Sequence, residues 1–187
     1  PQGILALVKQ YHYTLEEVAG GSRKCAQAEN LQEKPALLMV LETIQDPGNL
    51  GTILRAGEGA GVTGIVMDAN TADIYNPKVI RSTMGSVLRM PFVYVENLHE
   101  TLEELKKKKI RLFAAHLQGE NAYDQEDYTG PAAFLIGNEG NGLTEETAAM
   151  ADTYIRIPME GRVESLNAAV AASVLMFEAA RQRRNQK

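Results

Sequence analysis

From Pro35 onward the sequence alternates short apolar runs with longer stretches whose apolar residues recur at helical spacing. An apolar run of strand length, bounded by turn residues, is typical of a strand buried on both faces. Strands joined by intervening helices run parallel, with the helices on both faces of the sheet. The pattern therefore predicts an α/β fold with a mostly parallel sheet. The predicted strands cover 36–41, 64–68, 92–95, 111–115, 132–136 and 153–157. The predicted helices cover 50–61, 76–84, 98–108, 145–151 and 166–184.

Residues 1–34 do not share this alternation. An apolar run over 3–9 predicts one short strand, and the polar stretch over 11–34 predicts a loop with some helix around 14–18. Residues 35–187 then form one α/β domain, a size close to the roughly 100–200 residues usual for a domain. Because the chain begins at Pro1 and not at Met, we expect it to be part of a longer protein.

The composition narrows the function classes. A net charge of −5 and a pI near 5.3 argue against a protein that is basic all over, although a local basic patch stays possible. The single cysteine, Cys25, excludes an internal disulfide and suits the cytoplasm. No apolar run approaches the roughly 20 residues of a membrane span, and the start lacks signal-peptide character. Three scattered histidines and one cysteine give no metal-site spacing, so we expect neither a membrane nor a metal partner.

One apparent nucleotide motif is misplaced. Gly59, Gly61 and Gly64 match the dinucleotide fingerprint G-x-G-x-x-G. That fingerprint works only when a strand precedes the glycines and a helix opens after them, so that the helix N-terminus meets the pyrophosphate. Here the glycines end a predicted helix and lead into a strand, which favours Gly61 as a helix C-cap. An NAD-dependent oxidoreductase is therefore disfavoured.

The first motif that indicates a functional site covers residues 46–55. Pro47 and Gly48 predict a turn after the first strand, and Asn49 is interpreted as the N-cap of the next helix. Gly51 lies in the first helical turn, where it would let a backbone or ligand approach closely. Arg55 follows four residues later on the same helix face.

The second motif is the glycine-rich segment after the strand at 132–136. One tight turn does not need the three glycines found between 137 and 142, and the carboxyl end of a strand is where open α/β sheets bind ligands. Glu139, between these glycines, is interpreted as a site residue.

In the third motif, over 157–167, Ser165 is interpreted as an N-cap. Asn167 falls inside the predicted helix, where capping does not require its amide, and is therefore a site candidate.

Together the motifs resemble those of the SpoU family of RNA ribose 2′-O-methyltransferases, within the SPOUT superfamily. The resemblance runs from about Pro35 to the end of the last helix. It implies an α/β sheet with a C-terminal trefoil knot. It also implies a homodimer, in which the helix at 166–184 would form part of the interface. Residues 1–6 resemble the junction with an upstream RNA-binding domain in two-domain members. The resemblance therefore favours large-subunit rRNA as substrate, with tRNA next and a non-catalytic RNA-binding member as a further alternative.

The resemblance also implies a cofactor, S-adenosyl-L-methionine, and roles for individual residues. Its pocket would be lined by Gly137, Ile157, Leu166, Ile136, Leu117, Gly119 and Met159. The catalytic set would be Arg55, Asn49, Glu139, Ser165 and Asn167. RNA would contact Arg55, Arg81, Arg89 and Arg162. Since a guanidinium with a pKa above about 12 is a poor base, Arg55 would orient the ribose hydroxyl and stabilise the developing alkoxide. Glu139 would hold Arg55 or accept the proton.

Overall fold

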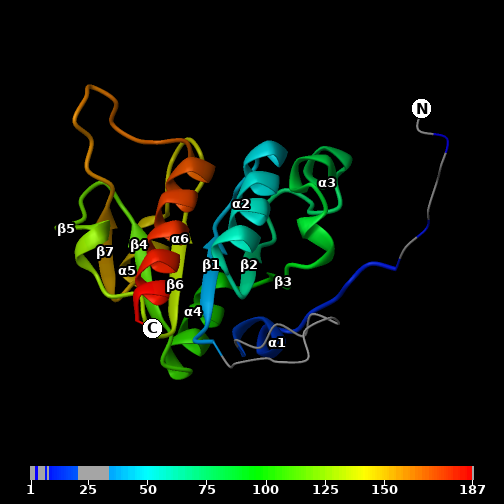
Figure 1. Cartoon of the computed structure of the whole chain (residues 1–187), viewed down its shortest axis with the longest axis horizontal. Coiled ribbons are helices and arrows are strands. Elements are labelled where there is room, and N and C mark those ends of the chain that lie inside the picture. Colours follow the sequence, from blue (N-terminus) through cyan, green and yellow to red (C-terminus); the bar gives the residue numbers. More distant parts are fainter. Residues whose placement is uncertain (1–2, 4–6, 8, 21–33, 187) are drawn as a thin grey trace.

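The structure is a computed structural model that describes Gly3, Leu7 and residues 9–20 and 34–186. One sheet of seven parallel strands, in the order β3-β2-β1-β6-β4-β7-β5, forms its centre (Figure 1). The strands are β1 (Leu37–Leu41), β2 (Gly64–Asp68), β3 (Phe92–Val95), β4 (Arg111–Ala115), β5 (Asn121–Ala122), β6 (Ala132–Ile136) and β7 (Thr153–Arg156). The predicted parallel α/β fold is confirmed, and the short β5 is an addition to it.

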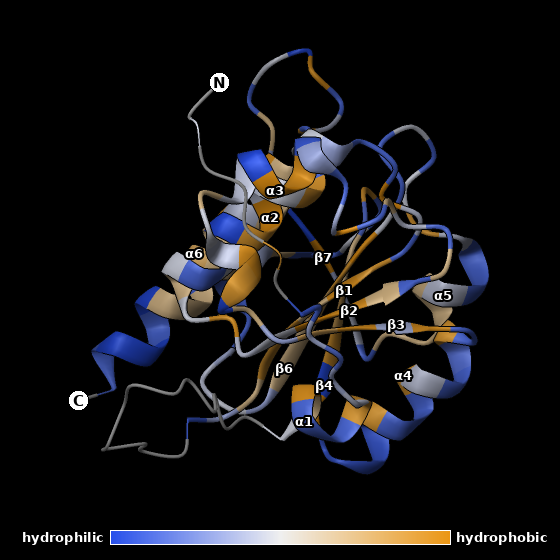
Figure 2. Cartoon of the chain, turned by 90° about the vertical axis from the view of Figure 1, so that its right-hand side faces the viewer, coloured by the Kyte–Doolittle hydropathy of each residue, from blue (hydrophilic) through white to orange (hydrophobic). Residues whose placement is uncertain are grey.

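The helices form two layers, as Figure 2 shows with the sheet between them. The α-helices are α1 (Leu15–Ala19), α2 (Pro47–Ala60), α3 (Pro77–Thr83), α4 (Leu98–Lys107), α5 (Glu145–Ala149) and α6 (Ala168–Asn185). Apolar residues of α2, α3 and α6 share one core with one face of the sheet, and those of α1, α4 and α5 share a second core with the other face. None of the helices in the described part of the chain is long and apolar enough to cross a membrane.

The start of α2 corrects one prediction. Asp46, not Asn49, is the N-cap: its carboxylate accepts a hydrogen bond from the Asn49 backbone N–H at 2.9 Å, and Pro47 takes the first helical position. Proline is favoured there because the N–H that it lacks would have no helical partner. The amide side chain of Asn49 is thereby free for another role. The predicted C-cap at Gly61 is confirmed, with φ of 87°.

The start of α6 corrects two more predictions, which concern Ser165 and Asn167. Asn167 is the N-cap, since its side-chain oxygen accepts hydrogen bonds from the backbone N–H groups of Ala169 and Val170 at 2.9 and 3.3 Å. The interpretation of Ser165 as the cap was therefore wrong, and so was the view that capping does not need Asn167. The helix begins two residues later than predicted because the segment before it runs as an exposed loop.

The N-terminal predictions are met only in part. The helix expected around 14–18 is α1, which begins after Thr14 in a capping box with Glu17. A strand was predicted over 3–9. Of its residues, Gly3, Leu7 and Lys9 are not in a strand, and the other four lie outside the described residues. Cys25 also lies outside them.

The strand order determines which loops meet. Strand β1 pairs with β2 on one side and β6 on the other, and β4 and β7 follow beyond β6. All strands are parallel, so the segments after β1, β6, β4 and β7 leave from the same carboxyl edge, where open α/β sheets bind ligands. The three motifs lie in these segments or directly after them. The trefoil knot stays a prediction.

The far end of α6 is anchored by a half-buried cation. The Arg183 guanidinium donates to the backbone carbonyl oxygens of Tyr128, Pro35, Ala36 and Gly130, at 2.6 to 3.0 Å. Burial lowers the pKa of Arg183 to about 10, so the group still carries its charge at neutral pH. The side chain thus joins the last helix to the start of β1 and to the segment before β6.

We expect Arg183→Lys to destabilise the fold by about 1–3 kcal/mol, because one ammonium cannot reach the four carbonyls that the planar guanidinium spans. Urea unfolding followed by circular dichroism measures the change. Arg184→Lys, at the exposed neighbouring position, is the matched control and should leave the unfolding free energy unchanged. Equal effects of the two substitutions would contradict an anchoring role.

Candidate functional site

Three side chains, one from each motif, are joined by hydrogen bonds at the carboxyl edge of the sheet. The Asn49 amide nitrogen donates to Glu139 Oε1 at 3.0 Å, and the Asn167 amide nitrogen donates to Asn49 Oδ1 at 3.0 Å. Asn167 at the same time caps α6. The row Glu139–Asn49–Asn167 therefore ties together the start of α2, the loop after β6 and the start of α6. Sequence reasoning had placed all three residues in the site.

The Glu139 carboxylate also holds the turn between β1 and α2. Its Oε2 accepts from the Gln45 backbone N–H at 3.1 Å, and its Oε1 accepts from that of Asp46 at 3.0 Å. Partial burial on its own would raise the pKa of Glu139. The hydrogen bonds from the Asn49 amide and from backbone N–H groups, those of Asp46 and Gln45 among them, outweigh that effect and hold the pKa below its ordinary value. Both carboxylate oxygens are thus engaged, and in the described part of the chain neither forms a hydrogen bond or ion pair with Arg55.

The loop over 137–144, which carries Glu139, folds tightly on itself. A Cβ at Gly137 would lie 2.1 Å from the backbone of Gly142 and Leu143, so only glycine fits there. Gly142 has φ of 71°, in the left-handed region. The Asn138 side-chain oxygen accepts from the Gly140 N–H at 2.9 Å, and its amide nitrogen donates to the Thr43 carbonyl at 2.9 Å. The glycines predicted to mark this loop therefore allow close backbone packing.

The residues expected around the cofactor gather at three neighbouring strand ends. Ile136 and Gly137 are buried at the end of β6, and Gly119 is buried after β4, where a Cβ would lie 2.7 Å from the Ile155 backbone. Leu117 beside it is 67% exposed. An apolar side chain uncovered among backbone groups suits an adenine ring, so this edge fits S-adenosylmethionine.

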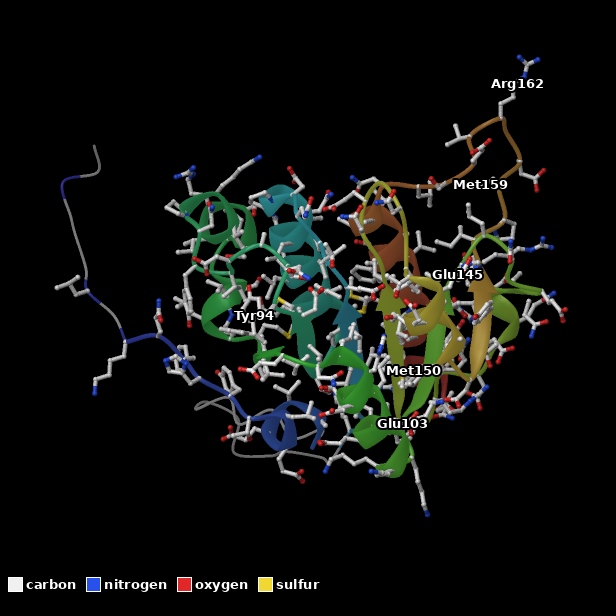
Figure 3. The ribbon with its side chains drawn as sticks, turned by 180° about the vertical axis from the view of Figure 1, so that it is seen from behind. Tyr94, Glu103, Glu145, Met150, Met159 and Arg162 are labelled. Carbon is white, nitrogen blue, oxygen red and sulfur yellow. The ribbon has the colours of Figure 1, made fainter. Side chains whose placement is uncertain are left out.

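The third motif supplies the other side of that edge. Ile157, Met159 and Leu166 are each half-buried, whereas Ser165 between them is exposed. Figure 3 shows Arg162 at the outer end of this loop, pointing away from the body of the protein, with Met159 closer to it. Ser165 forms no hydrogen bond with the residues that the structure describes.

The arginines differ in what they contact. Arg55 is exposed on α2, and within the described ranges its guanidinium has no hydrogen bond or ion pair. Arg81 and Arg162 are also exposed. Arg89, by contrast, forms a bidentate ion pair with Glu58, with nitrogen–oxygen distances of 2.5 and 2.9 Å. Arg55 thus has its donors available for a ligand.

Sequence reasoning missed part of the arrangement. The backbone N–H groups of Gln45 and Asp46 bind Glu139, and Asn138 shapes the loop, yet none was predicted. The Asp46-Pro47 pair could have located the helix start, because Asp at the N-cap and Pro at the first position are a recognised combination. Gly51, expected to permit a close approach, faces α3: a Cβ there would lie 1.7 Å from Ser82 Oγ. No cluster of three or more potential metal ligands occurs among the described residues.

Comparison with known proteins decides the family. The sequence profile of the SpoU rRNA Methylase family matches residues 36–177, most of the chain, and this range contains all three motifs. The chain belongs to the SpoU rRNA methylase family.

Individual members of the SpoU family show how far the similarity extends. The chain is 40% identical over 148 residues to 23S rRNA (guanosine-2′-O-)-methyltransferase RlmB of Xylella fastidiosa, covering 79% of this chain and 59% of that protein. It therefore spans about three fifths of that relative's length. The AdoMet-bound rRNA methyltransferase of Sinorhizobium meliloti superposes with a TM-score of 0.79 at 32% identity, over 92% of this chain and 62% of that one. The TrmH/SpoU tRNA modifying enzyme of A. aeolicus gives 0.74 at 28% identity, over 92% and 82%.

The lowered pKa of Glu139 predicts a pH dependence. A carboxyl whose pKa is lower in the folded than in the unfolded chain stabilises the fold above its unfolded pKa, and that contribution is lost as pH falls through the folded value. We expect Glu139→Gln to lower the unfolding free energy by about 1 kcal/mol or less at pH 7, since solvent screens this exposed group. The difference should shrink below pH 4.5, the ordinary pKa of the group.

Urea unfolding of both proteins at pH 7 and pH 3 measures this difference. Glu103→Gln, on the exposed side of α4, is the control and should leave stability unchanged at both pH values (Figure 3). A Glu139→Gln deficit that stays constant down to pH 3 would show that the carboxylate charge does not hold the turn.

Proposed function

We propose that this chain is the catalytic domain of an RNA ribose 2′-O-methyltransferase that uses S-adenosylmethionine. The observation that carries the proposal is the hydrogen-bonded row Glu139–Asn49–Asn167, which joins the three SpoU motifs at one edge of the sheet. Beside it lie the buried glycines and the uncovered Leu117 that suit the cofactor. The name of the Xylella fastidiosa relative supports rRNA of the large subunit as substrate, and we propose the cytoplasm as the location of this reaction.

The second candidate substrate is tRNA, which the A. aeolicus relative is named as modifying. A non-catalytic RNA-binding role is disfavoured because Asn49, Arg55, Glu139 and Asn167 are all present. An upstream RNA-binding domain remains part of the proposal, in line with the relatives' greater length.

In the proposed reaction the ribose 2′-oxygen forms a bond to the methyl carbon while the sulfur–methyl bond breaks, and the hydroxyl proton passes to solvent. Bound S-adenosylmethionine supplies the methyl group in activated form. Arg55 orients the hydroxyl and stabilises negative charge on its oxygen, using donors that no described residue occupies. RNA phosphate is a second target for the same guanidinium.

Glu139 has a positioning role in this proposal. Its oxygens accept from Gln45, Asp46 and Asn49, and its lowered pKa makes it a weaker base. We therefore replace the expectation that it holds Arg55 or accepts the proton with a structural one: it fixes the start of α2, from which Arg55 projects. Asn49 and Asn167 hold α6 and the third-motif loop to the same framework.

We expect Arg55→Ala to lower the rate of methyl transfer at least about 100-fold while binding of S-adenosylhomocysteine changes less than about threefold. Calorimetry measures the affinity, and transfer of labelled methyl groups to 23S rRNA and to tRNA measures the rate. Arg184→Ala, exposed near the end of α6, is the control and should keep full activity. Wild-type rates in Arg55→Ala, with RNA and cofactor binding intact, would refute the assignment.

The proposed function has its own test in the unaltered protein. We expect micromolar binding of S-adenosylhomocysteine by calorimetry and no binding of NAD. Binding of neither ligand would contradict the proposal, and binding of NAD alone would favour the oxidoreductase alternative.

We further propose a homodimer formed through the surface of α6 and α2. Val170 and Phe177 on α6 are apolar and about half exposed, and the Phe177 ring lies 3.8 Å from the position of a Cβ on Gly59 of α2. Exposed apolar and aromatic side chains on adjoining helices are typical of protein interfaces. Arg55 lies on α2 as well, so the catalytic site would adjoin this surface.

We expect Phe177→Glu to shift the protein from dimer to monomer, since a carboxylate would be buried without a partner at the interface. Sedimentation equilibrium measures the mass. Leu88→Glu, which alters an exposed apolar residue after α3, is the control and should leave the dimer intact. A wild-type protein that sediments as a monomer at micromolar concentration would overturn this part of the proposal.

A further inference from the structure

A buried carboxylate lies next to the 137–144 loop and has no part in the reaction described above. Glu42 directly follows β1 and is only 8% exposed. Its Oε2 accepts from the Thr144 backbone N–H at 2.8 Å, and its Oε1 accepts from the hydroxyls of Thr144 and Thr147 at 2.8 and 2.5 Å. Within the described part of the chain no cationic side chain pairs with it. In the described structure, hydrogen-bond donors alone hold this carboxylate.

The direction of each hydrogen bond in this cluster can be assigned. Thr147 has one hydroxyl proton, which it donates to Glu42, so its oxygen accepts from His99 Nε2 at 3.1 Å. The Thr144 hydroxyl likewise donates to Glu42 while its oxygen accepts from the Thr147 N–H at 3.2 Å, which caps α5. An amide in place of the carboxylate would offer one acceptor where the cluster needs two.

Glu42 begins a row of contacts along the loop. The Glu42 carboxylate holds Thr144 at the loop's end, the carbonyl of Thr43 accepts from the Asn138 amide at 2.9 Å, and the N–H groups of the following turn hold Glu139. The backbone N–H of Glu42 itself donates to the Ile136 carbonyl at 2.9 Å. Residues 42, 43, 45 and 46 therefore hold the end of β6, the first part of the 137–144 loop and its last residue.

We propose that Glu42 is a positioning residue for methyl transfer, and this inference rests on the function proposed above. By fixing Thr144 and Thr147 it holds the end of the 137–144 loop and the start of α5, so that the loop backbone meets the cofactor without reordering. A preorganised loop binds more tightly because the entropy of ordering has already been spent in folding. Loss of the Glu42 contacts should therefore weaken cofactor binding more than it slows the chemical step.

The test uses two variants and a matched control. Glu42→Gln keeps the shape of the side chain, and Thr147→Val removes only the hydroxyl of a fully buried residue. Thr63→Val makes the same substitution at another buried threonine, whose hydroxyl bonds the Leu37 backbone at the opposite edge of the sheet. Melting temperature, affinity for S-adenosylhomocysteine and steady-state kinetics are measured for all of them in the full chain.

We expect Glu42→Gln to raise the dissociation constant for S-adenosylhomocysteine roughly tenfold and Thr147→Val at least about threefold, as unpaired buried donors are costly. The KM for S-adenosylmethionine should rise in parallel, while kcat changes less than about twofold. Thr63→Val should lower the melting temperature yet leave the affinity unaltered. Affinity losses that follow melting temperature alike in all three variants would overturn the proposal.

Hydrogen exchange separates this inference from the proposed function. Without any cofactor, the amides over 138–144 should exchange faster in Glu42→Gln and Thr147→Val than in Thr63→Val or the wild type. If the wild type binds no S-adenosylhomocysteine, the proposed function fails, and the exchange data still decide whether Glu42 holds the loop. Unchanged exchange over 138–144 in Glu42→Gln would overturn the positioning role whatever the cofactor result.

Discussion

The carboxylate of Glu139 connects, directly and through Asn49, three parts of the chain that lie far apart in the sequence. It accepts from two backbone N–H groups of the turn after β1 and from the Asn49 amide, which in turn accepts from Asn167 at the start of α6. The glycines of the 137–144 loop contribute no side chains, so its geometry depends on Asn138 within the loop and on contacts from outside it. This group therefore helps to hold the starts of α2 and α6 together at the edge where Arg55 lies.

The sheet was largely predictable because its physical signal is local. Strands β1, β2 and β6 are buried along their whole length, which produces unbroken apolar runs in the sequence. Helix starts were less predictable, since several polar residues near Asn49 and Asn167 can cap and the choice depends on tertiary geometry. The strand order has no local signal: β6 inserts beside β1 although four other strands separate them in sequence.

The site, like the fold, has residues that could be predicted from the sequence and residues that could not. Glu139 stood out because it lies among glycines, Asn49 because it belongs to the first motif, and Asn167 because capping was not expected to require it. Glu42 did not stand out, because an acid after a strand looks solvated until Thr144 and Thr147 are placed over it. The partner of Arg55 is an RNA in the proposal, and no reading of a single chain reveals the contacts of a free guanidinium.

The contacts of α6 have a consequence for biosynthesis. Asn167 bonds a residue 118 positions earlier, and Arg183 bonds one 148 positions earlier. When the ribosome has completed β1, α2 and the 137–144 loop, the first two motifs have been made but the third motif and α6 have not. Such distant pairings form late, because a long loop must close first. The third motif should therefore take its place only when the last helix has emerged, and a stop codon before Arg183 would remove the contacts that anchor the far end of this helix.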